Sequence, residues 1–147
     1  MPTYNSIPLD DQYSLRILDI GDVEALVRLS HAMHKESPYA HLALDEDFIR
    51  TMPMTFGLFH EGELVGFLSG MKTKHHLFKA QFATELAYYV LPQHRKKHSL
   101  ELVRMYEAWA QDCDVLCLMN MNTPKLDKLY GKMGYTLLEK SYIKELR

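Results

Sequence analysis

The stretch that decides the fold runs from Thr84 to Trp109 and reads TELAYYVLPQHRKKHSLELVRMYEAW. Residues 85–90 predict a β-strand, because aromatic and β-branched residues favour that state. Pro92 ends the strand, since proline has no backbone N–H to donate and restricts the residue before it. Strict alternation divides the strand between two faces, with Leu86, Tyr88 and Val90 on one and Glu85, Ala87 and Tyr89 on the other.

A basic turn, Arg95-Lys96-Lys97-His98, precedes a helix that is predicted to begin near Ser99. Apolar residues recur at helical spacing through that helix, at Leu102, Tyr106, Trp109 and Cys113. The start of a helix presents unpaired N–H groups and the positive end of its dipole, here beside cationic side chains. The pattern therefore predicts a site for a phosphate-bearing ligand, although a basic run by itself is also typical of a solvated surface loop.

Strand, turn and helix together resemble the cofactor-binding core of the GNAT-superfamily N-acetyltransferases, which use acetyl-CoA. In that family the turn reads Q/R-x-x-G-x-G/A, and the helix that follows caps the pyrophosphate. Arg95 stands at the Q/R position, whereas His98 and Leu100 stand where the two glycines are expected. Glycine allows close approach of the backbone to the phosphates, so this turn departs from the family pattern. The resemblance implies a set of cofactor-binding residues: Tyr88, Tyr89, Val90, Arg95, Lys96, Lys97, His98, Ser99, Leu100, Asn120 and Asn122.

Some of these assignments have alternatives. Val90 would contact the pantetheine through its backbone, as the resemblance implies. Tyr88 and Tyr89 would either help to bind substrate or pack in the core. Asn120 and Asn122 lie after a predicted strand, where they would touch the cofactor or shape a turn.

A second motif, Leu129 to Tyr135 (LYGKMGY), resembles the family's late motif L-Y-x-K-x-G-F and is the most specific match in the chain. The resemblance implies that Tyr130 is the acid that protonates the departing thiolate. A phenol with an ordinary pKa near 10 keeps its proton at neutral pH. The alternative is a ring packed between helix and sheet.

Glu85 is the candidate base, directly or through water. An amine must lose a proton before it attacks a thioester. Some family members carry a glutamate at this place in the strand, and partial burial raises the pKa of a carboxyl group towards the useful range. The alternative is a carboxylate that points to solvent at the start of the strand.

The remaining patterns predict a mixed α/β (α+β) GNAT fold, with a mostly antiparallel twisted sheet flanked by helices. Gly66, inside a predicted strand, indicates a bulge or a close backbone approach. Residues 34–55 would overlie the acceptor side of the site, as the resemblance implies. The expected elements, in the order β-α-α-β-β-β-α-β-α-β, are strand 14–18, a helix from Asp19 to residue 37, helix 45–52, strands 56–59 and 64–71 joined by hairpin 60–63, strand 80–90, a helix from residue 99, strand 115–119 buried on both faces, helix 125–133 capped by Thr123, and strand 135–146.

Chain length, net charge and apolar runs limit the kinds of partner that the protein can have. The chain has 147 residues and a net charge of −2, which argues against nucleic acid, and no apolar run approaches a membrane span. We expect a flexible lead-in over residues 1–13 and a single domain over 14–147. The two cysteines form no zinc-binding pattern, and we expect both to be reduced thiols in a cytoplasmic protein. We also expect a monomer or homodimer that binds no metal ion.

The leading interpretation is an N-acetyltransferase that moves the acetyl group of acetyl-CoA directly to a primary amine of a small molecule or protein. Neither cysteine lies in the predicted site, so no acyl-cysteine step is expected. The alternative is a non-catalytic module of the same fold that binds acyl-CoA or a protein partner, which the missing glycines favour.

Overall fold

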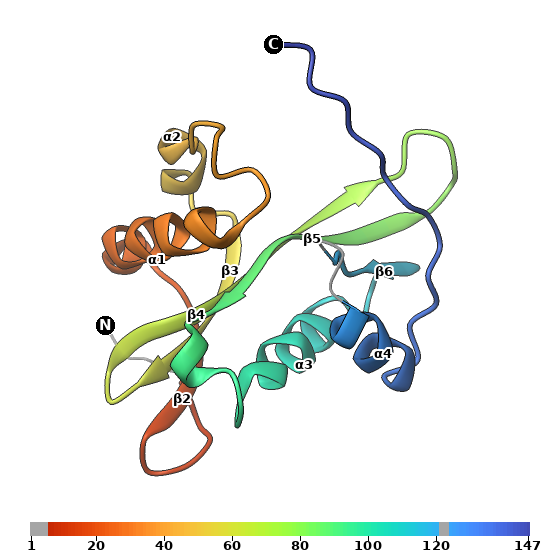
Figure 1. Ribbon diagram of the computed structural model, residues 1–147. Helices are drawn as coiled ribbons and strands as arrows, with labels where there is room; N and C mark the ends of the chain where they lie inside the picture. The colour runs from red at the N-terminus through yellow and green to blue at the C-terminus, as the bar shows by residue number, and fades with distance from the viewer. Residues whose placement is uncertain (1–5, 121–123) are drawn as a thin grey trace.

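The computed structural model describes residues 6–120 and 124–147. Its centre is one six-stranded sheet in the order β1-β2-β3-β4-β5-β6, in which only β5 and β6 are parallel. Helices α1 and α2 cover one face, and α3 and α4 cover the other (Figure 1). This confirms the predicted fold class. The strands are β1 (Ile7–Pro8), β2 (Tyr13–Ile17), β3 (Met54–His60), β4 (Glu63–Lys74), β5 (Gln81–Val90) and β6 (Val115–Cys117), and the helices are α1 (Val23–Glu36), α2 (Glu46–Arg50), α3 (Ser99–Trp109) and α4 (Pro124–Lys132).

The predicted helix start at Asp19 is confirmed, with a short 3₁₀ turn (Ile20–Asp22) leading into α1. The Asp19 carboxylate accepts from the N–H of Gly21 at 2.9 Å, and the Asp22 carboxylate accepts from the N–H of Asp19 at 2.8 Å. Arg16 binds both oxygens of Asp22 at 2.6 and 2.8 Å. This bidentate pair ties β2 to the start of α1.

The predicted hairpin between β3 and β4 is also confirmed. Glu61 and Gly62 form its turn with φ of 49° and 84°, the left-handed region that such two-residue turns require. Gly66 lies beside a bulge, since Leu58 pairs with Gly66 while Phe59 pairs with Leu64. A Cβ on Gly66 would lie 2.9 Å from Val90 Cγ2, so the neighbouring strand leaves no room for a side chain.

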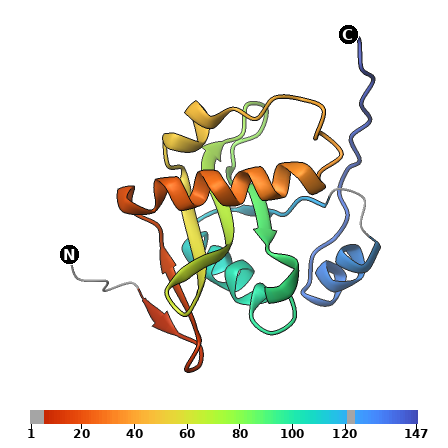
Figure 2. The ribbon, with the colours of Figure 1, turned by 60° about the vertical axis from the view of Figure 1, so that its left-hand side comes forward.

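The two faces of the sheet bury separate apolar clusters. One cluster packs under α3 and the other under α1. Figure 2 shows these two helices on opposite faces of the sheet. Leu68, Val90, Leu102, Val103 and Tyr106 belong to the α3 cluster, and Leu26, Leu29, Phe59, Phe67 and Tyr89 belong to the α1 cluster. Strand β5 contributes residues to both clusters, and the site described below lies on this strand.

The end of the chain differs from the prediction. The strand expected over 115–119 covers only Val115–Cys117, and it is half-buried because it forms the edge of the sheet. The strand expected over 135–146 is absent, and Tyr142 and Leu146 are 90% and 85% exposed. A closing strand was expected here, but the three-residue β6 offers little backbone for it to pair with.

The beginning differs as well. A lead-in without regular structure was expected over residues 1–13, yet Ile7 and Pro8 pair with Leu15 and Ser14. Asp10 then accepts hydrogen bonds from two backbone N–H groups, of Gln12 and Tyr13, each at 2.8 Å. Residues 1–5 lie outside the described part of the chain. Among the described segments, none of the helices has the length and apolar character that crossing a membrane requires.

Tyr106 anchors the short edge strand, so its hydroxyl is expected to matter for stability. The side chain is fully buried on α3, and its O–H donates to the Cys117 carbonyl at 2.8 Å. We expect Tyr106→Phe to lower the free energy of unfolding by about 1 kcal/mol, because the carbonyl loses its donor. Tyr142→Phe, at an exposed tyrosine, should leave it unchanged. Equal denaturation midpoints for both variants in urea would contradict this.

Candidate active site

A bulge in β5 sets the geometry of the site. Ser69 pairs with Ala87 and Gly70 pairs with Glu85, so the ladder skips Leu86. Glu85 therefore shares the face of Gly70, where an added Cβ would lie 2.9 Å from Tyr106 of α3. The predicted strict alternation is wrong at this point, because the extra residue turns Glu85 to the face that carries Tyr88.

On its other edge, β5 loses its pairing with β6 just before Glu85. The last pair between β5 and β6 is Thr84 with Cys117. From Glu85 to Val90, no strand in the described part of the chain pairs with that edge of β5. A row of backbone N–H and C=O groups on an open edge can bind an extended ligand.

Glu85 lies at the start of this opening. The residue is only 5% exposed, and the Met119 N–H points at its Oε1 from 3.4 Å. Burial raises the pKa of Glu85 to about 7, and the Met119 contact opposes the rise. A carboxyl group with that pKa exchanges its proton near neutral pH, as a general base must.

Tyr130 comes to the same opening from α4. It is 7% exposed, and its hydroxyl is buried with no hydrogen-bond partner among the described residues. Burial and the neighbouring Glu85 raise the pKa of Tyr130, so the phenol keeps its proton. The helix ends beyond it at Gly134 (φ 92°), and the Tyr135 N–H returns to the Tyr130 carbonyl at 3.0 Å. A buried hydroxyl without a partner indicates a place for a ligand atom.

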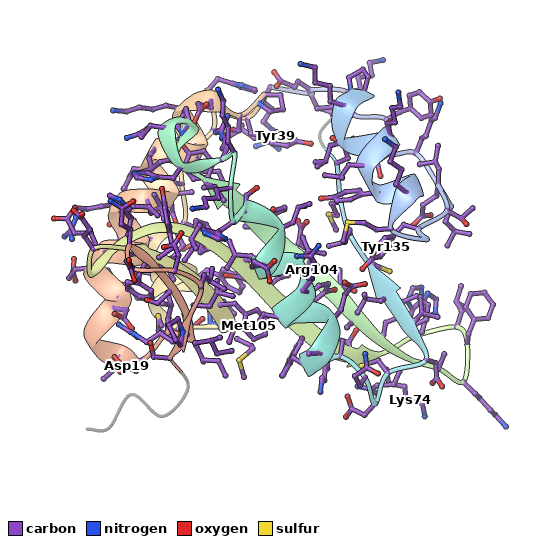
Figure 3. All side chains as sticks on the ribbon, turned by 90° about the horizontal axis from the view of Figure 1, so that it is seen from below. Asp19, Tyr39, Lys74, Arg104, Met105 and Tyr135 are labelled. Carbon is purple, nitrogen blue, oxygen red and sulfur yellow. The ribbon has the colours of Figure 1, made fainter. Side chains whose placement is uncertain are left out.

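Two further tyrosines hold this arrangement in place. The Tyr88 hydroxyl donates to the Ser99 carbonyl at 2.6 Å and fixes the start of α3 against β5. Tyr135, which the sequence analysis did not single out, donates to Glu107 Oε2 at 3.0 Å and links the end of α4 to α3 (Figure 3). Burial and the hydrogen bond to Glu107 raise the pKa of Tyr135. Its place in the late motif was the only sequence signal.

Tyr89 lies on the opposite face of the sheet from Tyr130. Its hydroxyl donates to Glu36 of α1, and the Arg95 guanidinium lies 5.4 Å from its ring centroid. Arg95 also donates from Nε to the Val90 carbonyl at 2.7 Å and from its terminal nitrogen to Glu36 at 3.3 Å. The structure thus joins Tyr89 and Arg95 to α1, away from Glu85.

Most of the positive charge of the basic turn is already paired. Asp10 Oδ2 lies 2.9 Å from both Lys97 Nζ and His98 Nε2, and these two groups hold the pKa of Asp10 well below its usual range. The His98 ring also packs against Tyr13, 5.1 Å between centroids. Exposed Lys96 has no ion pair among the described residues.

The first residues of α3 complete the turn. Ser99 donates from Oγ to the Arg95 carbonyl at 2.7 Å, and Leu100 is half-buried. Asn120 donates to Asp127 at 2.6 Å and so connects the exit of β6 to α4. Asn122 and the predicted cap Thr123 lie outside the described residues. Within the described ranges, no three His, Cys, Asp or Glu side chains form a group that could hold a metal ion.

The solved structures with a similar fold include acetyltransferases. A putative acetyl transferase from Pyrococcus furiosus has a TM-score of 0.73 at 15% identity, covering 92% of this chain and 100% of that one. A ribosomal-protein-alanine N-acetyltransferase from Brucella melitensis biovar Abortus has 0.71 at 18%, covering 92% and 99%. An aminoglycoside N-acetyltransferase in complex with CoA has 0.70 at 13%, covering 96% and 99%. At these identities the likeness establishes the fold.

Sequence comparison establishes the family. No curated protein matches the chain significantly. The model of the acetyltransferase (GNAT) family, however, matches residues 22–135, which include β5, the basic turn, α3 and the Tyr130 motif. The chain therefore belongs to the GNAT family of acetyltransferases.

Proposed function

We propose that this protein is an acetyl-CoA-dependent N-acetyltransferase that acts on a primary amine by direct transfer. The observation that carries the proposal is the unpartnered, buried Tyr130 hydroxyl beside the buried carboxyl group of Glu85. Their opposite protonation preferences suit one proton donor and one proton acceptor. Acetyl-CoA, when bound, would supply an acyl group activated as a thioester.

The residues present fit such a ligand in three respects. The unpaired edge of β5 from Glu85 to Val90 offers backbone groups to an extended pantetheine arm, apart from the Val90 carbonyl, which accepts from Arg95. The N–H groups at the start of α3, with exposed Lys96, offer a place for the diphosphate. The Tyr130 hydroxyl offers an unused hydrogen bond.

Each of the two candidate catalytic groups has a defined task. Glu85, with a pKa of about 7, would take a proton from the ammonium form of the acceptor, either directly or through water. Tyr130 would give its proton to the departing sulfur, because the hydroxyl has no competing acceptor among the described residues. Burial raises the pKa of the Cys117 thiol, which makes an acyl-cysteine step unfavourable.

A non-catalytic acyl-CoA-binding or protein-interaction module is the second candidate, and the paired basic turn favours it. Asp10 and Glu36 already bind the cations that would meet a diphosphate. Titration calorimetry with acetyl-CoA, followed by a thiol-release assay over a panel of amines, separates the two. Binding without turnover would support the module, and turnover would support the enzyme.

Removing the Tyr130 hydroxyl should affect turnover more than binding. We expect Tyr130→Phe to lower kcat by about 100-fold or more, in the range of general acid catalysis, while the Kd of acetyl-CoA stays within about twofold. Steady-state thiol release and calorimetry measure the two quantities. Exposed Tyr142→Phe is the matched control. Equal losses of kcat and affinity would mean that Tyr130 packs the core and does not act as an acid.

Ionisation of Glu85 should govern the pH dependence. We expect kcat/KM to rise with pH and to bend near pH 7, the pKa of the buried carboxyl group, because only the ionised form accepts a proton. Glu85→Gln should lower kcat/KM and remove this bend. A bend near pH 7 that persists in Glu85→Gln would assign the base to another group.

The same carboxyl group provides a check that does not depend on activity. Its pKa is higher in the folded protein than in the unfolded chain, so the folded state binds more protons between about pH 4.5 and 7. The contribution of Glu85 to stability is therefore present below that range and lost as pH rises through it. Urea titrations should show this loss in the wild type and not in Glu85→Gln.

Lys96 should contribute more to acetyl-CoA affinity than a lysine remote from the turn. Lys96→Ala is expected to raise the Kd of acetyl-CoA about two- to fivefold, the effect of one exposed charge near a helix start. Lys74→Ala, in the distant β4–β5 hairpin, should have no effect. Calorimetry at low and high salt measures both, and indistinguishable Kd values would place the diphosphate elsewhere.

A further inference from the structure

A cavity of about 200 Å³ lies on the face of the sheet opposite to Glu85, between α1, α2 and β5. Its walls come from α1, α2, β4 and β5, with residues just before and after α2. Among the residues that line it are Leu26 and Met33 of α1, Phe48 and Ile49 of α2, and Leu86 and Ala87 of β5. Both of the β5 residues belong to the bulge.

This cavity and the candidate catalytic carboxyl group meet at consecutive residues. Leu86, which the β4–β5 ladder skips, lines the cavity, and Glu85 faces the other side. Because β5 has no partner strand beyond Thr84 on its β6 side within the described residues, this edge of β5 is unpaired where the cavity wall and Glu85 adjoin. For the proposal made below, the free end of a molecule seated in the cavity has to pass this strand edge to reach Glu85.

The chemistry of the cavity excludes most polar occupants. Its one charged residue is Asp45, an exposed side chain at the mouth, whose Oδ1 already accepts from the Phe48 N–H at 3.0 Å. The Ser69 hydroxyl in its wall is bonded to Thr55 at 2.8 Å. A hydroxyl or ammonium group placed inside would lose its water and find few partners, which is unfavourable.

The volume of the cavity limits the size of the group that it can hold. A cavity of about 150 Å³ lined by Leu, Ile and Phe stays dry and binds benzene, so a volume of about 200 Å³ accommodates a ring or a short alkyl chain. We propose that this cavity receives the apolar group of the acceptor, and that the acceptor is a primary amine carried on an alkyl or aryl group of about six carbons. The proposal rests on the proposed acetyltransferase function.

An alkylamine series tests the substrate class. With acetyl-CoA saturating, kcat/KM should rise from propylamine to hexylamine by at least about tenfold, since each buried methylene contributes up to about fourfold. 2-Phenylethylamine should match hexylamine, and spermidine should react no better than propylamine. A peptide that begins with phenylalanine distinguishes a protein acceptor from a free amine. A kcat/KM for the peptide above that for 2-phenylethylamine would indicate a protein acceptor, and a lower value would indicate a free amine. A flat series, or a preference for spermidine, would overturn the proposal.

Met33→Glu tests the cavity itself. This change puts a carboxylate into the half-buried wall and should reduce the preference for hexylamine over spermidine by at least about tenfold, mainly through KM. Ile20→Glu makes the same kind of change at a residue that is 77% exposed and outside the cavity, and should leave the preference unchanged. Thermal melting of both variants checks their folding. Loss of the preference in both, or in neither, would contradict the assignment.

A binding measurement keeps this proposal separate from the proposed function. With CoA present, calorimetry should show tighter binding of hexylamine than of spermidine, and Met33→Glu should abolish the difference. This result without turnover of any amine would support the cavity and refute the transferase. Turnover of amines without regard to their apolar groups would support the transferase and refute the cavity.

Discussion

The site depends on two irregularities that lie close together on β5. At Leu86 the β4–β5 ladder skips a residue, and at Thr84 the β5–β6 pairing ends. The first irregularity turns Glu85 towards α3 and Leu86 towards α1, and the second exposes the edge between them. Without the bulge, the carboxyl group would point at the apolar cluster under α1. Without the opening, β5 would be closed to a ligand on both sides.

Local sequence predicts the helices and strands, but it does not predict the bulge in β5. Asp19, the Glu61-Gly62 turn and Gly134 act through short-range geometry, so α1, the β3–β4 hairpin and the end of α4 could be predicted. A bulge depends on the register between two strands, which the β5 sequence alone does not contain. Strict alternation therefore placed Glu85 on the wrong face. The strand expected at 135–146 is absent for a related reason, because a strand needs a neighbour to pair with and its own sequence does not supply one.

The sequence also could not predict the ion pairs of the basic turn, because they join residues that are far apart in the chain. The lysines and histidine of this turn suggested a cationic cradle, but Lys97 and His98 pair with Asp10, a residue 88 positions from His98. The sequence gives no sign of that contact. The paired side chains hold the basic turn against the turn between β1 and β2, which restrains the backbone where glycines would leave it free. In this protein the N–H groups at the start of α3 and exposed Lys96 are what remains for an anionic ligand.

Glu85 and Tyr130 destabilise the fold that positions them. A buried hydroxyl without a partner costs about 1–3 kcal/mol, and a buried carboxyl group that must ionise near neutral pH costs a similar amount. Both costs fall at the opening beside β5, where a bound ligand can supply the missing hydrogen bonds. A ligand that binds only the folded state and supplies these hydrogen bonds would recover this free energy on binding.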